Sequence, residues 1–134
     1  MRLAIAACAA FLSISVLPAS AQKALGEWQS ETGTTRMRVA PCRGGLCGTI
    51  TWLQQPRLDV NNASARLRSR PLVGTRLFFD MRPNGTNRWT GRAYVPSDGQ
   101  SYTGRMTMDG NKLQAVACSL GGTMCSGNLW TRIK

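Results

Sequence analysis

The sequence contains no histidine and only six acidic residues, against 17 basic residues, of which 14 are arginines. Without histidine, neither a serine–histidine nor a cysteine–histidine nucleophile pair can form. No motif brings two carboxylates together, and the glycine pairs lack the Lys-Ser/Thr that a phosphate-binding loop requires. The sequence therefore has no recognisable catalytic apparatus, and we expect a protein that is not an enzyme. A hydrolase that uses two of the six carboxylates is the alternative.

Long apolar runs are also missing, apart from one near the start of the chain. Arg2 precedes an apolar run over 3–17, and Ala19-Ser20-Ala21 has the small-residue pattern of a signal-peptide cleavage site. This run is shorter than the roughly 20 residues that a membrane helix needs, although a membrane anchor is the alternative. We predict a signal peptide over 1–21 and one domain over 22–134, in a periplasmic or secreted protein that does not span a membrane.

Four cysteines remain in the predicted mature chain: Cys42, Cys47, Cys118 and Cys125. An even number of cysteines in a small exported domain indicates disulfides. The sequence does not determine which of the three possible disulfide pairings forms. Pairing of Cys42 with Cys47 and of Cys118 with Cys125 would close a glycine-rich loop in each case. A zinc site is the alternative, and the wide cysteine spacing and the lack of histidine count against it. We expect no metal and no cofactor.

Segments in which apolar and polar residues alternate recur along the chain, with turn signals about every ten residues. The clearest two run over 89–95 and 101–108, and a three-residue turn at Ser97-Asp98-Gly99 would join them. In that registry Tyr94 and Tyr102 would face each other across the strands. Further strands are expected over 34–40, 49–53, 72–81, 112–118 and 128–133, with Val73, Leu77 and Phe79 in the core.

About eight short strands without an apolar helix predict an all-β fold. A small antiparallel up-and-down β-barrel is the favoured form, because closure removes the exposed edges of a sheet. Small strand residues leave room inside such a barrel for either a cavity or tight packing. They are Gly91, Ala93, Gly104 and Ala115.

The polar segment 54–69 is long for a connection in a small domain, which makes it a candidate functional loop. A short helical turn is expected around 63–68. If Arg66, Arg68 and Arg70 were extended, their guanidinium groups would share one face and could clamp a carboxylate or phosphate; in a helix they would spread apart. We take these three arginines, with Tyr94 and Tyr102, as candidate ligand-binding residues.

Two resemblances support the barrel. Gly26-Glu27-Trp28, with Arg132 near the end of the chain, resembles the lipocalin and calycin signature, which implies that Arg132 packs on Trp28 and closes one end of the barrel. The chain also resembles the bacterial family called domain of unknown function 2147, which implies a small exported lipocalin-like barrel without an established activity. Its matching motifs are Pro41-Cys42 through Trp52-Leu53, residues 70–74, residues 91–102 and Trp130-Thr131-Arg132.

These observations predict an exported β-barrel that binds a small amphipathic or anionic ligand in its interior. The alternative is a solid-core barrel whose arginine-rich surface docks on an acidic envelope partner, such as anionic lipid, polysaccharide or protein. The formal net charge of +11 would also attract nucleic acid in vitro. We expect no physiological nucleic-acid partner for an exported protein.

Overall fold

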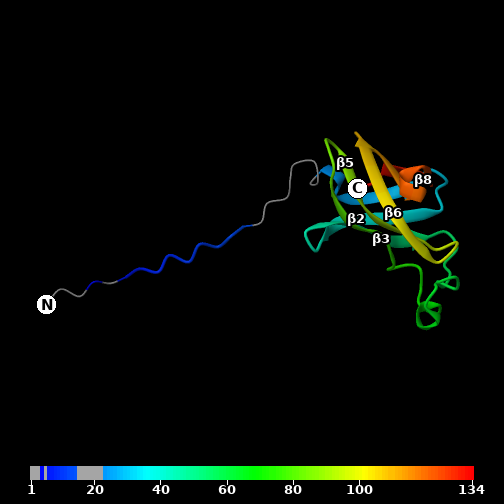
Figure 1. Cartoon of the computed structure of the whole chain (residues 1–134), viewed down its shortest axis with the longest axis horizontal. Coiled ribbons are helices and arrows are strands. Elements are labelled where there is room, and N and C mark those ends of the chain that lie inside the picture. The colour runs from blue at the N-terminus through cyan, green and yellow to red at the C-terminus, as the bar shows by residue number, and fades with distance from the viewer. Residues whose placement is uncertain (1–3, 5, 15–22) are drawn as a thin grey trace.

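The structure, a computed structural model, describes residue 4, residues 6–14 and residues 23–134 (Figure 1). Its ordered elements follow one another from residue 26 to residue 132. They are β1 (Gly26–Ser30), β2 (Thr35–Cys42), β3 (Gly45–Leu53), η1 (Ala65–Leu67), β4 (Arg76–Pro83), β5 (Arg88–Val95), β6 (Gln100–Asp109), β7 (Lys112–Ser119), η2 (Leu120–Gly122) and β8 (Met124–Arg132).

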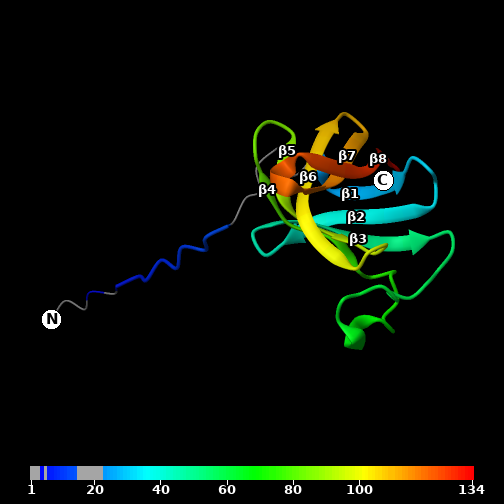
Figure 2. The same cartoon turned by 45° about the vertical axis from the view of Figure 1, so that its right-hand side comes forward.

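The eight strands form a closed antiparallel barrel. Each strand pairs with the next along the chain, and β1 pairs with β8 to complete the circle. This last contact is short and extends only from the pair Trp28–Arg132 to the pair Ser30–Trp130. The predicted all-β, up-and-down, lipocalin-like barrel is confirmed, and Figure 2 shows its strands wrapped around one interior.

Alternate connections lie at the same end of the barrel, because neighbouring strands run in opposite directions. One end has the connections 43–44, 84–87 and 110–111, together with the start of β1 and the end of β8; we call it the closed end. The other, which we call the open end, has the connections 31–34, 54–75, 96–99 and 120–123. The 54–75 connection, drawn in green, stands out from the barrel wall (Figures 1 and 2).

The predicted alternation holds well on β5 and β6, where Trp89, Ala93, Met106 and Met108 are buried. It fails on β4, which begins at Arg76 rather than at the predicted residue 72. The prediction of core positions on this strand was partly wrong. Val73 is 39% exposed and Phe79 is half-buried, whereas the core takes Phe78 and Met81.

A bulge explains the failure on β4. Asp80 has a φ of 52°, and the register with β5 shifts between Phe79 and Arg82. A bulge puts an extra residue on one strand, so the inward position moves by one beyond it. Strict alternation along the sequence therefore assigned the wrong faces here.

The β5–β6 connection also differs from the prediction. It has four residues, 96–99, because Val95 pairs with Gln100. Tyr94 consequently pairs with Ser101, and Tyr102 pairs with Ala93. The predicted pairing of Tyr94 with Tyr102 was wrong, since a shift of one residue places the two rings on opposite faces of the sheet.

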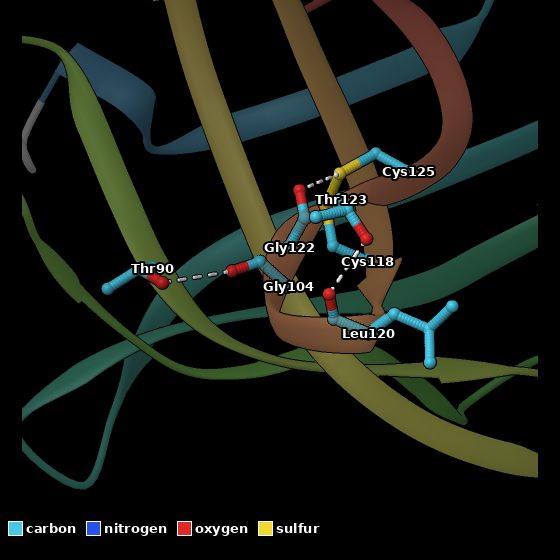
Figure 3. Close-up of a disulfide and its surroundings, with 7 residues drawn as sticks. All are labelled: Thr90, Gly104, Cys118, Leu120, Gly122, Thr123 and Cys125. Carbon is cyan, nitrogen blue, oxygen red and sulfur yellow. Dashed lines mark hydrogen bonds between the residues drawn. A yellow bond between two sulfur atoms is a disulfide. The ribbon is translucent and has the colours of Figure 1, made fainter.

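Two disulfides link the close cysteine pairs, Cys42 with Cys47 and Cys118 with Cys125. The first closes the turn between β2 and β3. The second joins β7 to β8 at the base of their connection, which contains η2. Leu120, in η2, projects away from the disulfide (Figure 3). Disulfides of this kind are typical of proteins outside the cytoplasm.

The predicted cleavage site after Ala21 lies outside the described residues, as do parts of the predicted signal peptide. The signal peptide over 1–21 and the domain bounds 22–134 therefore stay predictions. Within the part of the chain that the structure describes, no helix is long and apolar enough to cross a membrane.

Candidate functional site

The inward side chains of β5 to β8 become smaller from the closed end toward the middle of the barrel, before Val95, Tyr102 and Met124 at the open rim. Their face is defined by the register that pairs Trp89 with Met106, Met106 with Ala115 and Ala115 with Asn128. From the closed end inward, the series are Trp89-Gly91-Ala93 on β5, Met108-Met106-Gly104 on β6, Leu113-Ala115-Ala117 on β7 and Trp130-Asn128-Ser126 on β8. Large side chains thus fill the closed half, and small ones leave space in the open half.

This space is an open cavity of about 400 Å³. Its apolar wall is formed by Leu77, Phe78, Ala93, Ala115, Ala117 and Trp130. Asn128 and Ser126 add polar groups from β8, and none of the described residues that line the cavity carries a charge. A mostly apolar cavity with few polar groups is typical of sites for small molecules.

Trp130 contributes a buried polar group to this region. Its indole Nε1 has no hydrogen-bond partner among the described residues, and the same is true of Trp89 deeper in the core. An unsatisfied buried donor costs roughly 1–3 kcal/mol, so such groups are uncommon. Since the Trp130 nitrogen is buried, the polar side chains open to the cavity are Asn128 and Ser126.

A second hollow, of about 460 Å³, adjoins the cavity at the open end. The two share Val95, Ala117 and Ser126, so they form one continuous depression. On one side of the hollow the Tyr102 hydroxyl donates a hydrogen bond to the Asp98 carboxylate, and this bond raises the pKa of Tyr102. The tip joined by the Cys118–Cys125 disulfide also lines the hollow, through Thr123, Met124 and Cys125.

A buried polar cluster anchors the 54–75 connection to β5. Asp59 is 1% exposed, and its carboxylate accepts hydrogen bonds from the Tyr94 hydroxyl at 2.5 Å, Asn62 Nδ2 at 2.9 Å and Arg70 Nε at 3.0 Å. Arg70 Nη2 lies 2.9 Å from the same carboxylate, so the two residues form an ion pair. The guanidinium group of Arg70 also lies 5.6 Å from the centre of the Tyr94 ring. We call these four residues the Asp59 cluster.

The cluster keeps Asp59 charged in spite of its burial. Burial by itself would raise the pKa of the carboxyl group, but the hydrogen bonds from Tyr94, Asn62 and Arg70 and the positive charge of Arg70 outweigh it. The pKa of Asp59 is consequently below its usual value. The pKa of Tyr94 is raised, first by burial and then by its bond to the Asp59 carboxylate. Both shifts favour a neutral tyrosine donating to a carboxylate.

The three predicted loop arginines do not form one clamp. Residues 65–67 form the short helix η1, so the helical alternative applies and the side chains spread apart. Arg66 is exposed, Arg68 Nε donates to the Asn62 carbonyl oxygen at 2.9 Å, and Arg70 belongs to the Asp59 cluster. Of the five candidate ligand-binding residues, the structure brings only Arg70 and Tyr94 together.

A third hollow, of about 540 Å³, lies between the 54–75 connection and the outer surface of β4 to β6. Arg70 and Arg76 both line it, so its character is basic rather than apolar. The connection approaches the β5–β6 turn so closely that a Cβ atom on Gly99 would clash with the carbonyl oxygen of Asn61. Asn61 Nδ2 also donates to the carbonyl oxygen of Ser97 at 3.2 Å.

At the closed end, Arg132 lies over Trp28 with 4.3 Å between its guanidinium carbon and the ring centre. The indole Nε1 of Trp28 donates to the carbonyl oxygen of Ala24 at 2.9 Å. Arg132 Nη1 donates to the carbonyl oxygen of Leu25 at 2.6 Å. The residues before β1 are thereby held across this end, which is also filled by large core side chains.

Sequence reasoning did not identify the Asp59 cluster as a site. Asp59 counted only as one of the six acidic residues, and Asn62 was not singled out. One available signal was the order Leu58-Asp59-Val60, in which one charged residue stands between two apolar ones. The structure buries Asp59 and exposes both neighbours. The described residues contain no group of three or more histidine, cysteine or acidic side chains that could hold a metal ion.

The closed barrel, with one filled end and one hollow end, defines a small lipocalin-like protein. The chain belongs to the family described as "Uncharacterized protein conserved in bacteria (DUF2147)", which matches residues 26–132. Among solved structures, it is similar to HP1028 of the human pathogen Helicobacter pylori, a protein described as belonging to the lipocalin family. The TM-score is 0.72 at 20% identity over 83% of each chain, which supports a common fold. None of the curated proteins matches the chain.

Proposed function

We propose that this protein is exported and binds a small, largely apolar or amphipathic molecule in its open-end cavity. The cavity of about 400 Å³ carries the proposal, because the inward side chains of four successive strands shrink toward it. Its uncharged wall suits the apolar part of a ligand, and Asn128 with Ser126 suits one polar atom. A charged headgroup would stay nearer the mouth.

The proposal is binding without catalysis. The buried carboxylate of Asp59 already accepts from three donors, which supports a structural role in anchoring the connection. Asp98 accepts from Tyr102 and from the backbone of Gln100. A hydrolytic turnover that the single change Asp98→Asn abolished would contradict this part of the proposal.

Native mass spectrometry of the protein purified from a periplasmic extract tests both export and binding. We expect the processed chain, beginning at Gln22, with a bound mass that survives high salt, because an apolar cavity holds its ligand without relying on charge. A bare chain with only salt-labile anionic adducts would instead favour a surface function.

A matched pair of variants tests the cavity itself. Ala117 lines the cavity, whereas the next residue back along β7, Val116, lies on the opposite face of the strand. We expect Ala117→Phe to weaken the binding of the neutral fluorescent probe N-phenyl-1-naphthylamine by roughly tenfold or more, since the new ring occupies the space. Val116→Phe should leave probe binding unchanged. Equal probe binding by the two variants would exclude this cavity as the site.

A further inference from the structure

The 54–75 connection contains two extended arms that run side by side. Leu58 and Pro71 form a β-bridge, the Asp59 amide donates to the Arg70 carbonyl at 2.9 Å, and the Leu72 amide donates to the Arg57 carbonyl at 3.0 Å. Successive side chains of an extended arm point to opposite faces. At the bridge, Asp59 and Leu72 face the barrel, whereas Leu58 and Pro71 face away from it. Val60 and Val73 lie just beyond, in the turns that the Asn62 amide closes on Asp59 and the Thr75 amide closes on Leu72.

The side that carries Asp59 and Leu72 fixes the ribbon to the barrel. Asp59 is held by the Asp59 cluster, and Leu72 packs with Ile50 and Leu53 in a small apolar cluster that also contacts Leu77. These contacts fix which side of the ribbon packs on the barrel. The opposite side is therefore held toward solvent in the folded protein.

The outward face is apolar and exposed. Leu58 is 46% exposed, Val60 is 62% exposed and Val73 is 39% exposed, and Pro71 lies beside them. These three account for almost half of the seven large apolar side chains that are exposed in residues 23–134. Single exposed apolar residues need no explanation, but three on one short connection indicate a contact surface.

The charges around this face have one sign. Arg57, Arg66 and Arg68 are exposed on the same connection. Asp59 is the one acidic residue within 54–75, and it is buried and paired with Arg70. An apolar face bordered by unpaired arginines is complementary to an anionic lipid surface, which takes up aliphatic side chains and attracts guanidinium groups.

We propose that the outward side of the 54–75 ribbon docks on an anionic lipid bilayer, with Leu58, Val60 and Val73 entering the interfacial layer and the exposed Arg66 and Arg68 against the headgroups. Docking would turn the open end of the barrel toward the bilayer, so that an apolar ligand could pass between lipid and cavity. The docking stands on the ribbon alone and does not depend on the cavity being occupied.

Sedimentation of the mature protein with vesicles tests the docking. We expect binding to vesicles of phosphatidylglycerol mixed with phosphatidylcholine, and little binding to phosphatidylcholine alone. The double change Leu58→Ser, Val60→Ser should weaken binding by roughly tenfold, because it removes exposed apolar area. Ile133→Ser is the matched control, since Ile133 is 40% exposed at the closed end, and it should have no effect.

A second pair of variants separates local from overall charge. Arg66→Gln should weaken vesicle binding by about fivefold, whereas Arg43→Gln, at the closed end, removes the same charge and should have little effect. Equal loss in both variants would overturn the proposal in favour of attraction by net charge. Absence of vesicle binding would also overturn it, as would unchanged binding by the Leu58/Val60 variant; capture of an acidic polysaccharide or protein would then identify another partner. Probe binding in the cavity, measured on the same variants, should be unchanged.

Discussion

The Tyr94 hydroxyl donates a 2.5 Å hydrogen bond to the Asp59 carboxylate, across 35 positions in the sequence. This bond connects a barrel strand to the projecting ribbon. Tyr94 also lines both the open-end cavity and the basic hollow under the ribbon. One residue thus joins the wall of the proposed ligand site to the proposed membrane contact.

Loss of this bond should destabilise the protein measurably. We expect Tyr94→Phe to lower the free energy of unfolding by about 1–2 kcal/mol, because Asp59 stays buried with one donor fewer. Urea denaturation measures the change. Tyr102→Phe is the control, since its bond to Asp98 is exposed, and it should leave the midpoint unchanged. Identical midpoints for wild type and Tyr94→Phe would show that the cluster contributes nothing to stability.

The Asp59 cluster should also make stability depend on acid. The folded protein holds the pKa of Asp59 below its ordinary value of 3.8, which the unfolded chain regains. A lowered pKa contributes stability above the unfolded value, and this contribution is lost as the pH falls through the folded value. Wild type should therefore lose stability below about pH 4, and Asp59→Asn, already less stable at neutral pH, should lose less over that range. Thermal unfolding at several pH values compares the two proteins, and parallel curves would contradict the prediction.

The contact of Arg132 with Trp28 should stabilise the closed end. Arg132→Met keeps much of the apolar stem but removes the cation–π contact and the donors to the backbone of residues 23 and 25. We expect a loss of about 2–3 kcal/mol in the free energy of unfolding, measured by urea denaturation. Arg92→Met, on the outer face of β5, should cost little.

Peptide mapping without reduction checks the disulfides. Trypsin cuts after Arg43, between Cys42 and Cys47, so the first disulfide should hold two peptides together until a reductant releases them. No basic residue lies between Cys118 and Cys125, so the second should appear within one peptide that is lighter by two hydrogens. A peptide joining Cys42 to Cys118 would contradict the fold at both positions.

Much of the architecture follows from short-range sequence signals. Alternation on 89–95 and 101–108 predicted the buried faces of β5 and β6, because side chains of paired strands point to two sides with a period of two. The small residues Ala93 and Ala115 indicated space inside the barrel. Gly99, the last residue of the predicted turn, has a φ of 72°.

Other features depend on exact register and could not be read from alternation. One residue more in the β5–β6 turn separates Tyr94 from Tyr102, and the bulge at Asp80 moves Phe78 into the core in place of Phe79. The turn length and the bulge both result from backbone geometry that several neighbouring strands impose together, so no local sequence pattern predicts them.

By itself, the sequence predicted the antiparallel barrel, its small interior residues and the polar connection over 54–69. Only the tertiary structure decided that Asp59 is buried beneath Tyr94, that Arg70 is its ion-pair partner, and that the small residues of four strands coincide in one part of the barrel. The physical reason is that strand formation depends on neighbouring residues, whereas a buried ion pair and a cavity require residues distant in sequence to meet in one place.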